Sequence, residues 1–176
     1  MEYTSATAAN PHLGEPGLLV TPNTQERLSF RIGSEEYCID ILKVKEIRGY
    51  ETSTRMVGAP EYVKGVLNLR GIIVPIIDLR IKFGLPDVQY TALTVTVILN
   101  LVHGEVGIVV DRVSDVVELA PEQIRPVPEF DGYVDSGSVT GIGTVHQNGQ
   151  ERMLILLDVE RLMASAGTAA RAPTLQ

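Results

Sequence analysis

Apolar and polar residues alternate along several short stretches, which is the pattern of β-strands that bury one face. Apolar side chains occupy every second position in residues 28–32, and the alternation resumes in residues 37–41. The intervening residues 33–36 read Gly-Ser-Glu-Glu, a composition typical of a turn. The pattern therefore predicts a β-hairpin over residues 28–41.

A second pair of strands is predicted over residues 65–79, divided by a turn at Arg70-Gly71. The run 72–77 is apolar on both faces, which predicts a deeply buried strand. Its Pro75 has no backbone N–H and so favours an edge strand or a bulge. On the preceding strand, Asn68 and Arg70 share one face because side chains alternate sides.

The predicted helices are few and short. Asp78 is placed to cap a helical turn over residues 79–83, and Asp158 to cap a final helix over residues 159–163. A further short helix is predicted over residues 60–65, because proline suits the first helical position and glycine ends a helix.

The chain also contains an internal repeat, in which three blocks match in the same order. Val44, Glu46 and Ile47 are matched by Val113, Asp115 and Val116, each 69 positions later; residues 60–62 recur 68 positions later at 128–130, and residues 74–79 recur loosely 80 positions later at 154–159. The additional residues of the second copy are expected in the polar loop 146–150.

This repeat predicts an all-β fold of two small barrels, the first over about residues 26–90 and the second over about residues 91–163. Closure into barrels removes exposed strand edges, and a groove between two barrels is the expected binding place. A single β-sandwich with accidental similarity is the alternative. Residues 1–25 and 164–176 are rich in small and polar residues and are expected to be flexible tails.

Composition narrows the choice of partners and compartment. Hydrophobic residues make up 44% of the chain, charged residues 21%, and the net charge is −7, which disfavours nucleic acid as a partner. No apolar run reaches the ~18 residues that would span a membrane, so direct membrane insertion is not expected. The N-terminus has no signal-like segment, and the one cysteine, Cys38, allows no intramolecular disulfide. A reducing cytoplasm is therefore the expected compartment.

Residues that carry chemistry are sparse. His12, His103 and His146 have no second histidine or cysteine at metal-ligand spacing, and Cys38 lies in an apolar strand-like run. We therefore expect no metal, no cofactor and no catalytic residue, and interpret the chain as a binding protein. A small enzyme with ionisable residues converging in the groove is the alternative from a different class.

Four segments, residues 37–50, 64–83, 106–116 and 152–157, together resemble the CheW family of chemotaxis coupling proteins. The likeness extends from about Arg27 to Met163. It implies two five-stranded barrels of the Src-homology-3-like kind, related by an approximate two-fold duplication, in agreement with the repeat. It also implies a non-catalytic adaptor.

The resemblance implies two protein partners: the cytoplasmic tip of methyl-accepting chemoreceptors and the C-terminal regulatory domain of the histidine kinase CheA. The adaptor would be cytoplasmic and recruited to receptor arrays at the inner face of the membrane. A coupling protein of a related non-flagellar chemosensory array and a generic peptide-binding barrel remain the alternatives.

The resemblance also assigns roles to particular residues. Glu46 is the expected ionic partner of Arg70 within the fold. The residues implied to face the receptor are Asn68, Arg70, Val44, Gly107 and Val113, and those implied to contact the kinase, on the outer faces of both barrels, are Ile47, Arg125 and Phe130.

Overall fold

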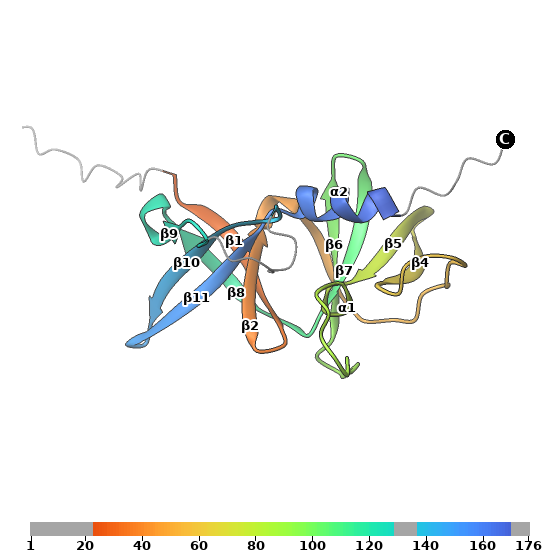
Figure 1. Ribbon diagram of the computed structural model, residues 1–176, viewed down its shortest axis with the longest axis horizontal. Coiled ribbons are helices and arrows are strands. Elements are labelled where there is room, and N and C mark those ends of the chain that lie inside the picture. Colours follow the sequence, from red (N-terminus) through yellow and green to blue (C-terminus); the bar gives the residue numbers. More distant parts are fainter. Residues whose placement is uncertain (1–22, 129–136, 170–176) are drawn as a thin grey trace, which may run out of the picture.

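The computed structural model describes residues 23–128 and 137–169, and it consists mainly of strands (Figure 1). The strands are β1 (Gln25–Ile32), β2 (Glu35–Asp40), β3 (Val44–Gly49), β4 (Val63–Leu69), β5 (Ile72–Asp78), β6 (Val95–Leu101), β7 (Gly104–Val110), β8 (Arg112–Leu119), β9 (Ile124–Arg125), β10 (Val139–Gln147) and β11 (Gln150–Leu157). The helices are η1 (Ile41–Lys43), α1 (Leu79–Lys82), η2 (Pro121–Gln123) and α2 (Val159–Ala169). The predicted all-β class with short helices is confirmed.

The strands form two sheets, one in the order β8-β1-β2-β11-β10-β9 and the other in the order β3-β6-β7-β5-β4. Figure 1 shows them side by side, with the orange strands from the start of the chain next to the blue strands from its end. The order of the first five strands of one sheet matches that of the other. In both sheets the one parallel pair holds the same place, β2 with β11 and β5 with β7. The pairing pattern therefore supports the internal duplication.

The two copies are interleaved, so the strands are not divided between the sheets at residue 90 as predicted. The six-stranded sheet takes β1 and β2 from the first half and β8 to β11 from the second. The five-stranded sheet takes β3 to β5 from the first half and β6 and β7 from the second. The cause lies at the third strand of each copy. After the β1–β2 hairpin the chain passes to the other sheet to form β3, and after the β6–β7 hairpin it passes back to form β8.

Two matching backbone hydrogen bonds align the ends of the copies. The Asp78 N–H donates to the Tyr62 carbonyl at 2.7 Å, and the Asp158 N–H donates to the Ser138 carbonyl at 2.7 Å. Tyr62 is thus equivalent to Ser138 and Asp78 to Asp158. Part of the insertion in the second copy consequently precedes β10, and the remainder lengthens the β10–β11 hairpin. The predicted loop 146–150 is therefore wrong in extent, because only residues 148 and 149 form the turn.

Three apolar clusters form the interior. One cluster lies within the six-stranded sheet, around Cys38 and Leu154, and another within the five-stranded sheet, around Ile76 and Ile98. The largest joins both sheets and both α-helices, and its members include Phe30 of β1. Each sheet therefore has its own interior, as a barrel does, while a shared core fills the centre of the predicted groove between them.

Both α-helices begin at the predicted aspartates. The carboxylate of Asp78 accepts from the backbone N–H of Arg80 at 3.0 Å, and that of Asp158 accepts from the N–H of Arg161 at 3.2 Å. The second helix continues to Ala169, so part of the predicted tail 164–176 is helical. Residues 1–22 and 170–176, the rest of the two predicted tails, lie outside the described residues.

The helix predicted over residues 60–65 is wrong. The Val63 N–H donates to the Pro60 carbonyl at 2.9 Å and closes a turn, after which β4 begins. Gly65 lies inside β4 at φ +144°, and a Cβ atom there would stand 2.1 Å from the carbonyl oxygen of Thr54. Glycine is therefore needed because the backbone of Thr54 pairs closely with Val66 beside it.

The prediction for residues 72–77 is only partly confirmed. Val74 and Ile76 are buried, but Ile72 and Ile73 are 45% and 61% exposed, because this end of β5 has no partner beyond β4. The strand is not an edge, since it lies between β4 and β7. Pro75 is accommodated because the pairing with β7 begins only at the following residue.

Candidate functional site

Three of the residues singled out by the resemblance, Glu46, Asn68 and Arg70, lie at the two edges of the five-stranded sheet. Its two edge strands are β3 and β4. Glu46 on β3 accepts a hydrogen bond from the guanidinium of Arg70, in the turn after β4, at 2.5 Å. The predicted partner of Arg70 is therefore in contact with it, and the ion pair connects the two edges of the sheet.

Arg48 is a second partner of Glu46 that the sequence analysis did not identify. It donates to the other carboxylate oxygen at 2.9 Å, and it also contacts Glu51 at 3.3 Å. The hydrogen bond from Arg48, together with the positive charge of Arg70, lowers the pKa of Glu46. The spacing contained the signal, because residues two apart on a strand share a face. Glu46 is therefore an ionised carboxylate held from two sides.

Arg70 occupies an unfavourable backbone conformation. It has φ +55° and is followed by Gly71 at φ +86°, the pattern of a two-residue turn that favours Asn-Gly or Asp-Gly. The corresponding turn of the other sheet is Asn148-Gly149, at φ +52° and +75°, which follows that preference. A non-glycine residue in this region costs about 1–3 kcal/mol. Arg70 is thus placed where a small polar residue would fit better.

The side chain of Arg70 is 72% exposed, whereas that of Glu46 is 28% exposed. The ion pair therefore presents its cationic end to solvent. Asn68, which lies in β4 two residues before Arg70, accepts a hydrogen bond from the Gly71 N–H through its amide oxygen at 2.9 Å. That hydrogen bond fixes the turn from which Arg70 projects.

The other residues implied to face the receptor are more deeply placed. Val44 and Val113 are half-buried and pack against the shared core at equivalent positions of the two copies. Gly107 is buried in β7, where a Cβ atom would approach Ile76 and Thr96 to 2.6 and 2.9 Å. The structure therefore brings Glu46, Arg70 and Asn68 together and places Gly107 within the packing of the sheet.

The residues implied to contact the kinase lie on different sheets. Ile47 on β3 is 45% exposed, and Arg125 on β9 is exposed. Phe130 lies outside the described residues. The two described positions are exposed on different sheets, and their assignment as kinase contacts stays a prediction.

An arginine also holds a carboxylate at the equivalent point of the six-stranded sheet. Asp115 on β8 corresponds to Glu46, and it accepts hydrogen bonds from Arg152 on β11 at 2.9 and 3.1 Å. Ser29 on β1 donates to the same carboxylate at 2.5 Å, and Glu36 on β2 also pairs with Arg152. The hydrogen bonds from Arg152 lower the pKa of Asp115. The match between Glu46 and Asp115 in the repeat was the signal for this second cluster.

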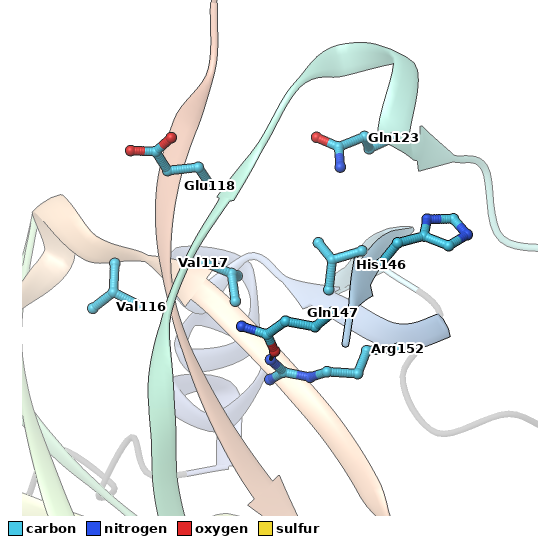
Figure 2. Close-up of a pocket in the computed structure, with 8 residues that line it drawn as sticks. Val116, Val117, Glu118, Gln123, His146, Gln147 and Arg152 are labelled. Atoms are coloured by element: carbon cyan, nitrogen blue, oxygen red, sulfur yellow. Dashed lines mark hydrogen bonds between the residues drawn. The ribbon is translucent and has the colours of Figure 1, made fainter. Parts of the chain in front are cut away.

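A shallow hollow of about 360 Å³ lies beside this cluster (Figure 2). Figure 2 shows Gln147 and Arg152 pointing toward one another, and Arg152 donates to the Gln147 amide oxygen at 2.8 Å. The same two side chains also line a second hollow on this sheet. The rest of the lining is Val116, Val117, Glu118, Gln123, Val145 and His146.

Groups that could carry chemistry are isolated. Cys38 is buried, and burial raises the pKa of its thiol to about 12, which leaves almost no thiolate at neutral pH. In residues 23–128 and 137–169, no three His, Cys, Asp or Glu residues are grouped so that they could hold a metal ion. Nor is any helix in this part of the chain long and apolar enough to cross a membrane.

Comparison with known proteins agrees with this architecture. The family model of the CheW-like domain matches residues 26–167. The chain belongs to the CheW family. A relative from Klebsiella aerogenes, Chemotaxis protein CheW, is 55% identical over 141 residues, which cover 80% of this chain and 82% of the relative. The Chemotaxis protein CheW of Bacillus subtilis is 30% identical over 149 residues, covering 85% and 93% of the two chains.

A solved structure of the CheW family has a similar fold. The crystal structure of the scaffolding protein TtCheW from Thermoanaerobacter tengcongensis matches with a TM-score of 0.69 at 27% sequence identity. The match covers 77% of this chain and 90% of that one. It therefore includes both sheets rather than one repeat unit.

Proposed function

We propose that this chain is a non-catalytic chemotaxis adaptor that joins the cytoplasmic tip of a methyl-accepting chemoreceptor to the regulatory domain of the histidine kinase CheA. Membership of the CheW family and the scaffolding role named for the Thermoanaerobacter relative support the adaptor class. The adaptor would work in the cytoplasm, at receptor arrays on the inner face of the membrane. It would act by holding two proteins in a fixed arrangement, and so requires no chemistry of its own.

The observation that carries the proposal is the conformation of Arg70. A strained backbone at an exposed position points to a function that the side chain performs. Asn148 at the equivalent turn shows that the fold accommodates the relaxed residue there. Arg70 also does little for the fold, because a pair with one side chain 72% exposed is screened by solvent. A partner's carboxylate is the group that the exposed guanidinium suits.

The proposed receptor site therefore consists of Arg70, oriented by Glu46, with Asn68 fixing the turn. Val44 and Val113 would support it from the shared core. Gly107 would contribute indirectly, by allowing β7 to pack closely against its neighbours. The proposed kinase contacts are Ile47 on one sheet and Arg125 on the other, together with Phe130.

The test uses purified full-length protein with a receptor cytoplasmic fragment and CheA, and it measures binding to each partner and the phosphorylation of CheA. Arg70→Asn should lower receptor affinity by about 10-fold or more, equivalent to about 1.4 kcal/mol or more. The same change should raise the melting temperature by about 1–4 °C, because it relieves backbone strain. Kinase binding should be unchanged.

The matched control is Asn148→Arg, which places arginine in the equivalent turn of the other sheet. It should lower the melting temperature and leave both partners bound normally. If Arg70→Asn binds the receptor fragment as well as the wild type does, the receptor assignment is wrong. If neither partner binds the wild-type protein, the adaptor function is wrong for this chain.

A further inference from the structure

Two arginines lie directly opposite each other on neighbouring strands of the six-stranded sheet. Arg31 on β1 is paired in register with Arg112 on β8, and the two strands are antiparallel. Side chains at directly opposite positions lie on the same face with their Cβ atoms about 4.5–5.5 Å apart, and like charges in this position are destabilising. The pair is therefore a feature that the fold tolerates rather than one that stabilises it.

The acidic groups around this pair are already engaged. Glu36 is opposite Arg31 on β2, but it is bound by Arg152. Asp115 is bound by Arg152 and Ser29.

Asp111 precedes Arg112, and its two carboxylate oxygens accept from Arg80 at 3.0 Å and from the Gly33 N–H at 2.7 Å. Among the described residues, the guanidinium groups of Arg31 and Arg112 form no hydrogen bond or ion pair, although the Arg31 carbonyl accepts from the Asp111 N–H at 3.0 Å. Their guanidinium groups thus remain available to another molecule.

Both arginines line the second hollow on this sheet, whose volume is about 350 Å³. Ser114 supplies a hydroxyl to the same lining, which also contains Arg152 with the two carboxylates that hold it, Glu36 and Asp115. The hollow is open to solvent and shares Gln147 and Arg152 with the one in Figure 2. An acidic chain of net charge −7 therefore carries, at this one place, two unpaired cations over a concave surface.

We propose that this hollow binds an acidic peptide segment of a partner protein, with Arg31 and Arg112 holding its carboxylates. Charge complementarity selects the ligand, because guanidinium groups bind carboxylates through paired hydrogen bonds. A peptide suits the site better than a single small anion, because an extended acidic segment can offer a separate carboxylate to each of Arg31 and Arg112. The site is on a different sheet from Arg70, and the proposal does not rest on the proposed function.

The probe is fluorescein-labelled hexaglutamate, and the measurement is its fluorescence anisotropy with full-length protein at low salt. Wild-type protein should bind it, and binding should weaken as salt rises, since exposed charges are screened. A labelled Gly-Ser hexapeptide should not bind. Inorganic phosphate should compete only weakly; if phosphate competes as well as unlabelled hexaglutamate does, the site is a simple anion site and the peptide assignment is wrong.

Two variants separate binding from folding. Arg31→Gln should weaken binding about 3–10-fold. Arg112→Glu should abolish binding and raise the melting temperature by about 1–2 °C, because it replaces a like-charge pair with an opposite-charge pair. The matched control is Arg55→Gln, an exposed arginine in the loop between β3 and β4, and it should bind as the wild type does. Unchanged binding by Arg112→Glu, or equal weakening by Arg55→Gln, would overturn the proposal.

Discussion

The buried guanidinium of Arg80 is the point at which a single substitution should affect the fold most. Its side chain is 1% exposed and that of Asp78 is 0% exposed. Arg80 donates to the two oxygens of Asp78 at 3.0 and 2.9 Å and to Asp111 at 3.0 Å. It also donates to the carbonyl of Gln89 at 2.5 Å, and its guanidinium lies 4.8 Å from the ring centroid of Tyr90.

This arrangement ties three parts of the molecule together. Asp78 ends β5, Gln89 and Tyr90 belong to the segment before β6, and Asp111 lies between β7 and β8. Asp111 in turn accepts the N–H of Gly33, in the turn between β1 and β2. Arg80 therefore links the five-stranded sheet to the hairpin of the six-stranded one.

We expect Arg80→Met to lower the free energy of unfolding by about 3–5 kcal/mol, because it leaves the Asp78 carboxylate buried without its cation. That is a large part of the ~5–15 kcal/mol of a typical domain, and it should lower the melting temperature by about 6–20 °C. The double variant Arg80→Met, Asp78→Asn should recover at least half of the loss. The asparagine is neutral. Its amide oxygen can still accept from the backbone N–H of residue 80, and its amide NH2 can donate to the Tyr90 hydroxyl oxygen.

Urea denaturation and thermal melting followed by circular dichroism measure both effects. The matched control is Arg161→Met in α2, where the side chain is 68% exposed and lies 3.5 Å from its capping aspartate, Asp158. An exposed pair of this kind contributes about 0–1 kcal/mol. If Arg80→Met costs no more than Arg161→Met, or if the double variant is no more stable than the single one, the reasoning from buried charge is refuted.

Two further predictions concern buried positions. Folding favours the protonated thiol of Cys38, whose pKa burial raises from 9.0 to about 12, so its contribution to stability is complete below pH 9 and is lost as pH rises toward 12. Cys38→Ala should therefore reduce the loss of stability over that range in pH-dependent urea denaturation, and an unchanged slope would contradict the assignment. Gly107→Ala should cost about 1–3 kcal/mol, because its Cβ would approach Ile76 to 2.6 Å, whereas Gly49→Ala, with open space around it, should cost less than about 1 kcal/mol. Equal melting temperatures for the two variants would show that β7 has room to adjust.

The sequence predicted what depends on local pattern. Alternation located the β1–β2 hairpin, and the two aspartates before short apolar patterns, Asp78 and Asp158, begin the two α-helices. The repeat matched the segment after Val44 with that after Val113, and Asp78 with Asp158, as the structure does. Its match of residues 60–62 with 128–130 was wrong, because Tyr62 is equivalent to Ser138. The repeat did not show which strands pair. Similarity between two segments does not reveal whether the third strand of each copy, β3 or β8, joins the sheet of its own hairpin or the other sheet.

The side-chain networks depended on tertiary contacts that no local pattern contains. Arg80 follows a capping aspartate in a short helix, where an arginine is ordinarily solvated. Arg80 is buried because the segment around Gln89 covers it, and that segment has no periodic pattern of apolar residues from which this could be predicted. Arg48 was missed although its spacing from Glu46 was informative, and the Arg31–Arg112 pair required the register between β1 and β8.

The interleaving has a consequence for how an adaptor of this shape would respond to its partners. Arg70 belongs to the five-stranded sheet, and the Arg31–Arg112 pair belongs to the six-stranded one. Because the chain passes from one sheet to the other before β3 and again before β8, each sheet contains strands from both halves of the chain. The shared core and the Arg80 network join the sheets further, and close-packed interiors transmit displacement rather than absorb it. In the proposed adaptor, the shared core and the Arg80 network would carry a displacement from one sheet to the other, as coupling between two protein partners requires.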